Sequence, residues 1–200
     1  TFWSDAQLAR LRKFASDGGG LLMIGGHNSF GPGGYGETDV EAALPVVCGP
    51  RNMPQEKTAF VPQLTADGEI HPIFDGVSSF FPGPDRAARA DATLPDLSGC
   101  VTVVGPKPAA SVLAIHPTRA TGSGPKIVLA VQQFGEGRTA ALTADSTWRW
   151  LMEMQTAAVA SPYPQFWGQL VRWLANVETK ARDAAPAAVL RLDRTHVRAG

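Results

Sequence analysis

The sequence has no excess of charge of either sign and no long apolar run. Its 200 residues hold 18 basic and 18 acidic side chains, so the formal net charge at pH 7 is zero. Without a basic field, nucleic acid and anionic membranes are disfavoured as partners. No apolar run approaches the roughly 20 residues that a membrane-spanning helix needs. We therefore expect no nucleic-acid binding and no direct insertion of this segment into a membrane.

Cysteine and histidine are scarce. Only Cys48 and Cys100 are present, and two cysteines do not make a disulfide framework. Two buried thiols are favoured over one disulfide, which stays open as the alternative. His71 has no second histidine, cysteine or carboxylate at the spacing of metal ligands. We expect no metal site and no cofactor.

Glycine, in contrast, is abundant, with 21 residues. Residues 18–36 read GGGLLMIGGHNSFGPGGYG, which predicts a tight turn, a fully buried strand over 20–25 and a glycine-rich loop after it. In an open α/β sheet, ligands bind beside the C-terminal ends of the strands. The loop is therefore the first candidate binding site. Its candidate ligand-binding residues are Gly25, Gly26, His27, Asn28, Ser29, Gly33, Gly34 and Thr38.

Two kinds of ligand fit this loop. Its glycines leave backbone N–H groups bare, and a helix that begins at Thr38 would attract anions, so a small anion is the expected occupant of the main concavity. Gly31, Gly33 and Gly36 also form the pattern G-x-G-x-x-G, which keeps nucleotide binding as an alternative. The pattern begins six residues after the strand and contains a proline, which argues against the nucleotide.

The remaining sequence predicts alternating helices and strands. Capping boxes begin helices at Ser4 and at Thr38, the second of which Pro45 must end. Antiparallel pairing is expected in the second half, around the glycine turn 135–137. The expected helices cover 4–17, 38–44, a stretch from about 148 and about 164–180; the expected strands cover 20–25, 58–65, 100–104, 111–115, 126–132 and 138–143. Asp67-Gly68 is expected to form a turn.

Two domains are expected within the chain. Residues 1–181 form the main α/β domain, and 182–200 form a linker and the first strand of a following β-domain. The chain begins without methionine, so we expect it to be a piece of a longer protein.

Five blocks in order carry a family resemblance: GGGLLMIGG with SFGPGGY, the LPV after the short helix, HPIF, FGEGRTAALTADSTWRW and FWGQLVRWLA. Together they resemble the putative glutamine amidotransferase family of the class I glutamine amidotransferase-like superfamily. The resemblance implies a three-layer, flavodoxin-like α/β fold with helices on both faces of the sheet. It also implies that one or two strand-helix units precede this chain. Such domains occur in large membrane-anchored bacterial proteins, which implies a place in the cell envelope.

Enzymes of this superfamily carry a nucleophilic cysteine on a strand-to-helix elbow and a His-x-Glu pair after a later strand. The elbow position here falls on Gly25, and the later strand is followed by Ala144, Asp145, Ser146 and Thr147. All three catalytic positions differ from the working pattern. The resemblance therefore implies a catalytically degenerate domain that acts as a binding or structural module, with other domains of its parent protein or a protein complex as partners.

A rebuilt hydrolase is the competing interpretation. His27, Ser29 and Asp145 would supply its acid-base groups and nucleophile, because both strand ends should open at one edge of the sheet. The simpler interpretation is that His27 bonds loop backbone and that Asp145 caps the helix near Trp148. In that case one of Trp148 and Trp150 is buried and the other lies nearer to solvent.

Overall fold

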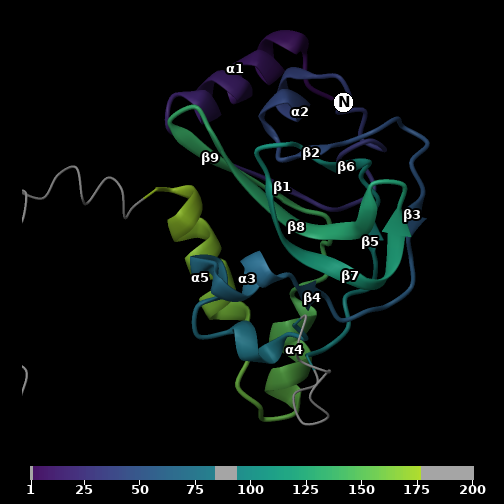
Figure 1. Ribbon diagram of the computed structural model, residues 1–200, viewed down its shortest axis with the longest axis vertical. Coiled ribbons are helices and arrows are strands. Elements are labelled where there is room, and N and C mark those ends of the chain that lie inside the picture. Colours follow the sequence, from purple (N-terminus) through teal and green to yellow (C-terminus); the bar gives the residue numbers. More distant parts are fainter. Residues whose placement is uncertain (1, 84–93, 177–200) are drawn as a thin grey trace, which may run out of the picture.

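A computed structural model describes residues 2–83 and 94–176. The expected linker and strand at 182–200, and the expected end of the last helix at 180, lie outside these residues. Within them the chain forms a three-layer α/β domain with a central sheet and helices on both faces (Figure 1). The predicted fold class is therefore confirmed.

Among the described residues, the central sheet has five strands in the order β1-β9-β8-β7-β4. Of these neighbours, β1 and β9 run parallel to each other, and the other pairs are antiparallel. Two further pairs of two-residue strands lie beside it, β2 with β6 and β3 with β5. The bounds are β1 Gly20–Ile24, β2 Val46–Val47, β3 Gln55–Glu56, β4 Gln63–Leu64, β5 Cys100–Val101, β6 Gly105–Pro106, β7 Ser111–Thr121, β8 Gly124–Phe134 and β9 Gly137–Leu142.

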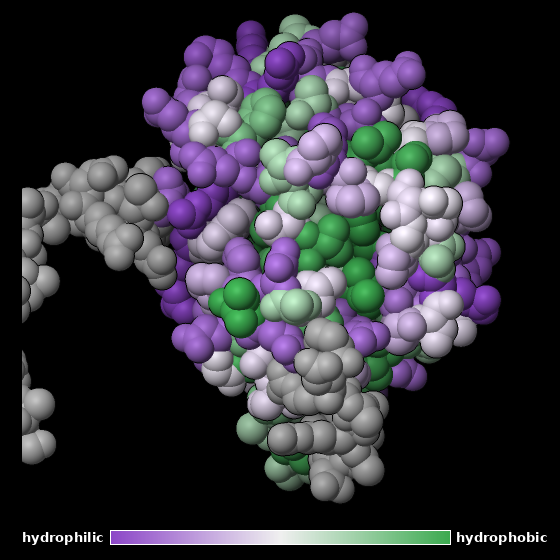
Figure 2. All heavy atoms as spheres, in the orientation of Figure 1, coloured by the Kyte–Doolittle hydropathy of each residue, from purple (hydrophilic) through white to green (hydrophobic). Residues whose placement is uncertain are grey.

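Helices enclose the sheet from two sides. Helices α1 and α2 cover one face, and α3, α4 and α5 lie on the other (Figure 1). The bounds are α1 Asp5–Ser16, α2 Asp39–Ala43, α3 Ala66–Ile70, α4 Arg149–Thr156 and α5 Tyr163–Leu174, with 3-10 turns η1 Pro72–Phe74 and η2 Ser78–Phe80 beside α3. In Figure 2, the outer surface over α1, at the top of the view, is mostly hydrophilic, whereas apolar residues gather near the middle of the view.

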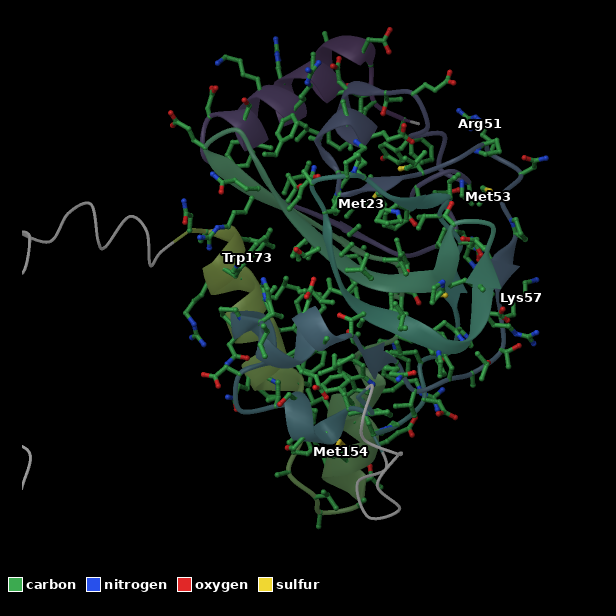
Figure 3. The ribbon with its side chains drawn as sticks, viewed as in Figure 1. Met23, Arg51, Met53, Lys57, Met154 and Trp173 are labelled. Carbon is green, nitrogen blue, oxygen red and sulfur yellow. The ribbon has the colours of Figure 1, made fainter. Side chains whose placement is uncertain are left out.

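The sheet separates two apolar cores. Leu8 of α1 and Val40 of α2 pack with the sheet residue Ala141 in the first core. In the second, Phe166 and Leu170 of α5 pack with the sheet residue Leu142. Neighbouring residues of β9 thus point to opposite faces, as the period of two in a strand requires. Figure 3 labels Met23, which belongs to β1 of the sheet, and Met154, which belongs to α4.

Side-chain caps fix where the short helices begin. Ser4 and Gln7 form the predicted capping box of α1, and the Thr38 hydroxyl accepts the Glu41 N–H at the start of α2. The Thr65 hydroxyl likewise accepts the Gly68 N–H, so residues 66–70 form α3 instead of the predicted turn at Asp67-Gly68. The predicted strand 58–65 is correspondingly reduced to β4, two residues long.

Strand lengths in the second half also differ from the prediction. The predicted strand 100–104 is cut to β5, because Val104 donates its N–H to Val47 and the next residues pair with β2. The predicted strands 111–115 and 126–132 instead extend into an 11-residue hairpin pair, β7 and β8, closed around Gly122. The predicted hairpin turn before Gly137 is confirmed.

Strand β1 is less buried than predicted. It lies at an edge of the central sheet, and its burial is intermediate except at Ile24, which is 41% exposed. The prediction of a fully buried strand was wrong because β1 has a neighbour on one side only among the described strands. Leu21 and Met23 still pack on one core and Leu22 on the other.

The hydrogen bonds made by the segment after β9 differ from the predicted ones. Helix α4 has Trp148 at its N-cap with no side-chain cap, and Asp145 is exposed, so the predicted Asp145 cap is wrong. The Ser146 hydroxyl, which is buried, instead accepts the Ser98 N–H at 2.8 Å. The predicted contrast between the two indoles is confirmed, with Trp148 53% and Trp150 2% exposed.

We expect Trp150→Ala to lower the free energy of unfolding by about 3 to 5 kcal/mol, because a cavity would replace the indole. That indole packs on Phe81 and Phe166 at centroid distances of 5.3 and 5.7 Å and donates to the Pro95 carbonyl at 3.0 Å. Trp148→Ala is the matched control and should change stability by less than about 0.5 kcal/mol. Urea unfolding measures both. Equal losses in the two variants would contradict this assignment of the core.

Candidate functional site

The C-terminal ends of β1 and β9 meet at one edge of the sheet. The two strands are parallel and in register from Gly20 opposite Arg138 to Ile24 opposite Leu142. The Gly25 N–H then donates to the Leu142 carbonyl at 2.7 Å. The loops that carry His27 and Asp145 therefore leave the sheet from neighbouring strand ends, as expected. This edge is where the fold would place chemistry.

Gly25 leaves no space for a side chain. A Cβ atom built on it would lie 2.1 Å from the Thr143 carbonyl oxygen and 2.9 Å from the Ala144 nitrogen. Both are backbone atoms, which cannot move aside as a flexible side chain can. Gly26 is the residue with positive φ, at 146°. A cysteine at position 25 would therefore require the ends of β1 and β9 to separate.

The three candidate hydrolase residues do not form a nucleophile-base pair. The Ser29 hydroxyl donates to the Gly26 carbonyl at 2.9 Å, and Ser29 is only 8% exposed. Its proton is thus committed to a backbone acceptor, whereas an activated serine donates to its base. His27 and Asp145 are both exposed. Ser29 therefore stabilises the turn after β1 in this structure.

The second half of the glycine-rich loop lines a cavity of about 370 Å³. The walls come from Gly31, Gly34, Gly36, Glu37, Glu41, Val47, Gly49, Pro50 and Arg51. Of the predicted ligand-binding residues, only Gly34 contributes to it, beneath the Arg51 guanidinium. Figure 3 shows Arg51 at the outer edge of the molecule. Gly33 packs against the Asn28 carbonyl, and Thr38 caps α2. Gly25 to Ser29 lie at the strand end, outside these walls.

Glu41 occupies the backbone donors that we expected an anion to use. Its carboxylate accepts the Cys48 N–H at 2.8 Å and the Glu37 N–H at 3.3 Å. A carboxylate of the protein itself thus satisfies these N–H groups, and its charge would repel a second anion. The expectation of a small anion has no support in this cavity. Glu41 is the acidic member of the predicted capping box, a pattern that predicts a helix start but not the bonds of its carboxylate to the Glu37 and Cys48 N–H groups.

Both cysteines are free and buried. Burial, with the nearby Glu41 carboxylate, raises the pKa of the Cys48 thiol far above its usual range. Burial likewise raises the pKa of Cys100 to about 11. The thiolate is the reactive form of cysteine, so both side chains are poor nucleophiles in the folded protein.

Residues 2–83 and 94–176 lack two further features. There, no three histidine, cysteine, aspartate or glutamate residues gather as metal ligands would. Among the same residues, no helix has the length and apolar character needed to cross a membrane.

Gly25→Ala should lower the free energy of unfolding by about 1 to 3 kcal/mol, because its methyl group would overlap the Thr143 carbonyl. Gly122→Ala is the matched control, since a Cβ there meets nothing within 4 Å and its φ is not positive. The control should stay within about 0.5 kcal/mol of the original protein. Thermal and urea unfolding measure the difference. A fully stable Gly25→Ala protein would mean that the elbow can accept a side chain.

Comparison with solved structures places the fold. The chain is similar to cytoplasmic protein STM3548 of Salmonella typhimurium, with a TM-score of 0.58 and 19% identity over 84% of this chain and 59% of that one. It is also similar to cytoplasmic protein STM1381 of Salmonella typhimurium LT2, with a TM-score of 0.60 and 20% identity over 84% of this chain and 60% of that one. The chain thus spans about three fifths of each structure. At this identity the likeness shows the flavodoxin-like fold alone.

Comparison by sequence gives the family. No curated protein matches the chain. A family model described as "Putative glutamine amidotransferase" matches residues 3–176, which include both strand ends and the glycine-rich loop. The match covers most of the chain and its range includes all five sequence blocks. The chain therefore belongs to this glutamine amidotransferase-like family.

Proposed function

We propose that this domain is a non-catalytic binding or structural module of the glutamine amidotransferase-like fold. One observation carries the proposal: the Thr143 carbonyl occupies the space that a side chain at position 25 would need. A covalent glutamine reaction requires a nucleophile at that elbow, and losing it removes nearly the whole covalent route. The residues after β9, Asp145 to Thr147, also lack the His-x-Glu pair of the enzymes.

The two native thiols are poor replacements for the missing nucleophile. Cys48 is 0% and Cys100 is 6% exposed, and neither follows the end of β1. Their raised pKa values keep them protonated near pH 7. The hydrolase alternative with His27, Ser29 and Asp145 has less support, because the Ser29 hydroxyl already donates to a carbonyl.

The edge strand β1 supports an interaction role. Gly25 and Gly19 direct their backbone groups to β9, so Leu22 and Ile24 direct theirs away from it. Such an open edge can pair with another strand. We infer that the partner is another part of a longer protein, or of a protein complex, that adds a strand beside β1. The bacterial envelope location implied by the resemblance stays a prediction, and the two solved structures compared above are of proteins named as cytoplasmic.

A glutamine-derived chloroketone tests the absence of covalent chemistry. We expect the intact mass to stay unchanged after incubation with the native protein, because both thiols are buried and protonated. Iodoacetamide in denaturant should label both cysteines and serves as the control for thiol integrity. Stoichiometric labelling of Cys48 or Cys100 that glutamine blocks would refute the proposal.

Hydrogen exchange tests the role of β1. In this chain alone, the amides of Leu22 and Ile24 should exchange at least about tenfold faster than those of Leu21 and Met23, which point to β9. In the longer protein that we propose, the two fast amides should become protected. Unchanged exchange of Leu22 and Ile24 in that protein would show that no strand is added there.

A further inference from the structure

Strand β7 is irregular between two of its pairings with β8, Ile115 with Ile127 and Ala120 with Pro125. Residues 116–119, which we call the β7 bulge, thus oppose a single residue of β8. A bulge interrupts the hydrogen-bonded ladder and leaves its extra residues without partners in the neighbouring strand. The last three residues of this bulge are exposed. This part of β7 can therefore move without unfolding either apolar core.

His116, the first residue of the β7 bulge, is buried and holds the bulge by accepting two hydrogen bonds. Its Nδ1 accepts the N–H groups of Thr118 at 3.2 Å and of Arg119 at 3.1 Å. Its ring also stacks on Phe60, with centroids 4.1 Å apart. A ring nitrogen that accepts carries no hydrogen, so the neutral ring has its hydrogen on Nε2. The closed bulge thus depends on the neutral form of one side chain.

Protonation of His116 would reverse the role of Nδ1. In the imidazolium both ring nitrogens carry a hydrogen and only donate. Nδ1 would then face the N–H groups of Thr118 and Arg119 as a third donor, and neither hydrogen bond could persist. Nε2 offers no compensation, because it is buried and has no hydrogen-bond partner among the described residues. A charged ring is therefore incompatible with the closed bulge.

The charges that act on His116 also favour the neutral ring. Burial lowers the pKa of His116, Glu56 raises it, and Lys126 and Arg119 lower it. The Glu56 carboxylate lies 3.1 Å from the Lys126 ammonium and 3.5 Å from the Arg119 guanidinium. One carboxylate is thus shared between two cations before any charge forms on the imidazole.

We propose that His116 makes the β7 bulge a pH-dependent element of this fold. At neutral pH the uncharged ring accepts both N–H groups and the bulge is closed. In acid the ring is protonated and the bulge opens locally, while the paired parts of β7 and the two cores stay folded. Opening moves residues 116–119 away from Phe60 and enlarges the cavity of about 460 Å³ that lies between residues 58–63 and the bulge. This element is independent of the strand end that Gly25 closes, since it lies on other strands.

The direction of the pH effect follows from linkage between protonation and opening. A histidine in a solvated, open segment has a pKa of about 6.5, and His116 in the closed bulge has a lower one. Above about pH 6.5 both forms are neutral, and closure is fully favourable. Below it, the open form binds a proton that the closed form does not. The ratio of open to closed bulge should therefore rise about tenfold per pH unit, until the pH reaches the pKa of the closed form.

Amide hydrogen exchange of Thr118 and Arg119, measured as the pH is lowered from about 6.5, tests the proposal. The intrinsic exchange of an open amide slows about tenfold for each pH unit. The rise in opening should cancel this slowing, so both amides should exchange at a rate that stays constant within about twofold. The amides of Leu22 and Ile24, which no histidine holds, are the internal reference and should slow about tenfold per unit.

Two matched variants complete the test. His116→Asn keeps an acceptor oxygen at the position of Nδ1 but does not titrate, so Thr118 and Arg119 should then slow about tenfold per pH unit. His71→Asn is the control, because His71 likewise accepts a backbone N–H through Nδ1, from Ile73 at 3.3 Å, and has a pKa lowered by burial. In that variant the two bulge amides should keep their constant rates.

Three results would each overturn the proposal. They are tenfold slowing of Thr118 and Arg119 in the original protein, constant rates in His116→Asn, and a hydrogen on Nδ1 of His116 at neutral pH in ¹⁵N-resolved NMR of the ring. Should His116→Asn not fold, the rates in the original protein and in His71→Asn decide.

Discussion

The backbone contact between the ends of β1 and β9 is the constraint on which the rest of this site depends. Gly25 donates to Leu142 and lies against the Thr143 carbonyl, and only a residue without a side chain allows that approach. The same contact sets the directions in which the two following loops leave the sheet. Closing the strands in this way removes the space of an elbow nucleophile. The contact that joins the two strand ends is therefore also the contact that leaves no room for a side chain at position 25.

In the glycine-rich loop and the segment beside it, backbone N–H groups that could bind a ligand donate instead to a side chain of the same domain. Glu41 brings its carboxylate to the N–H groups of Glu37 and Cys48, while Lys107 donates to the carbonyls of Glu41 and Ala42. Both ends of α2 are therefore held by side chains of the same domain. An anion from solvent would have to displace a tethered carboxylate, whose effective concentration is high. The loop is better explained as a structural unit than as an empty ligand site.

Sequence patterns predicted those elements that local chemistry defines. The capping residues Ser4 and Thr38 and the glycine turn before Gly137 act over a few residues, and these predictions were confirmed. Predictions failed where distant residues decide: β1 lies at a sheet edge, and Ser146 rather than Asp145 makes the hydrogen bond that fixes the segment after β9. The start of α3 at Thr65 is a different case, because its cap on Gly68 is local and the prediction of a turn missed it. At the candidate site, the position of Gly25 could be predicted from sequence, whereas the Thr143 carbonyl that closes it could not. Such contacts depend on strand pairing, which is not encoded in a local period.

The surroundings of His116 also show what local sequence patterns cannot predict. His116 had no motif around it, since a single histidine in a strand resembles many structural histidines. Its chemistry arises from a bulge in β7, which gives Nδ1 two backbone donors and so fixes the hydrogen on Nε2. Neither the register shift nor the stacking on Phe60 can be derived from the residues near position 116 alone. The Thr143 carbonyl thus fills the space beside the end of β1, while an irregularity in β7 leaves the buried Nε2 of His116 without a hydrogen-bond partner among the described residues.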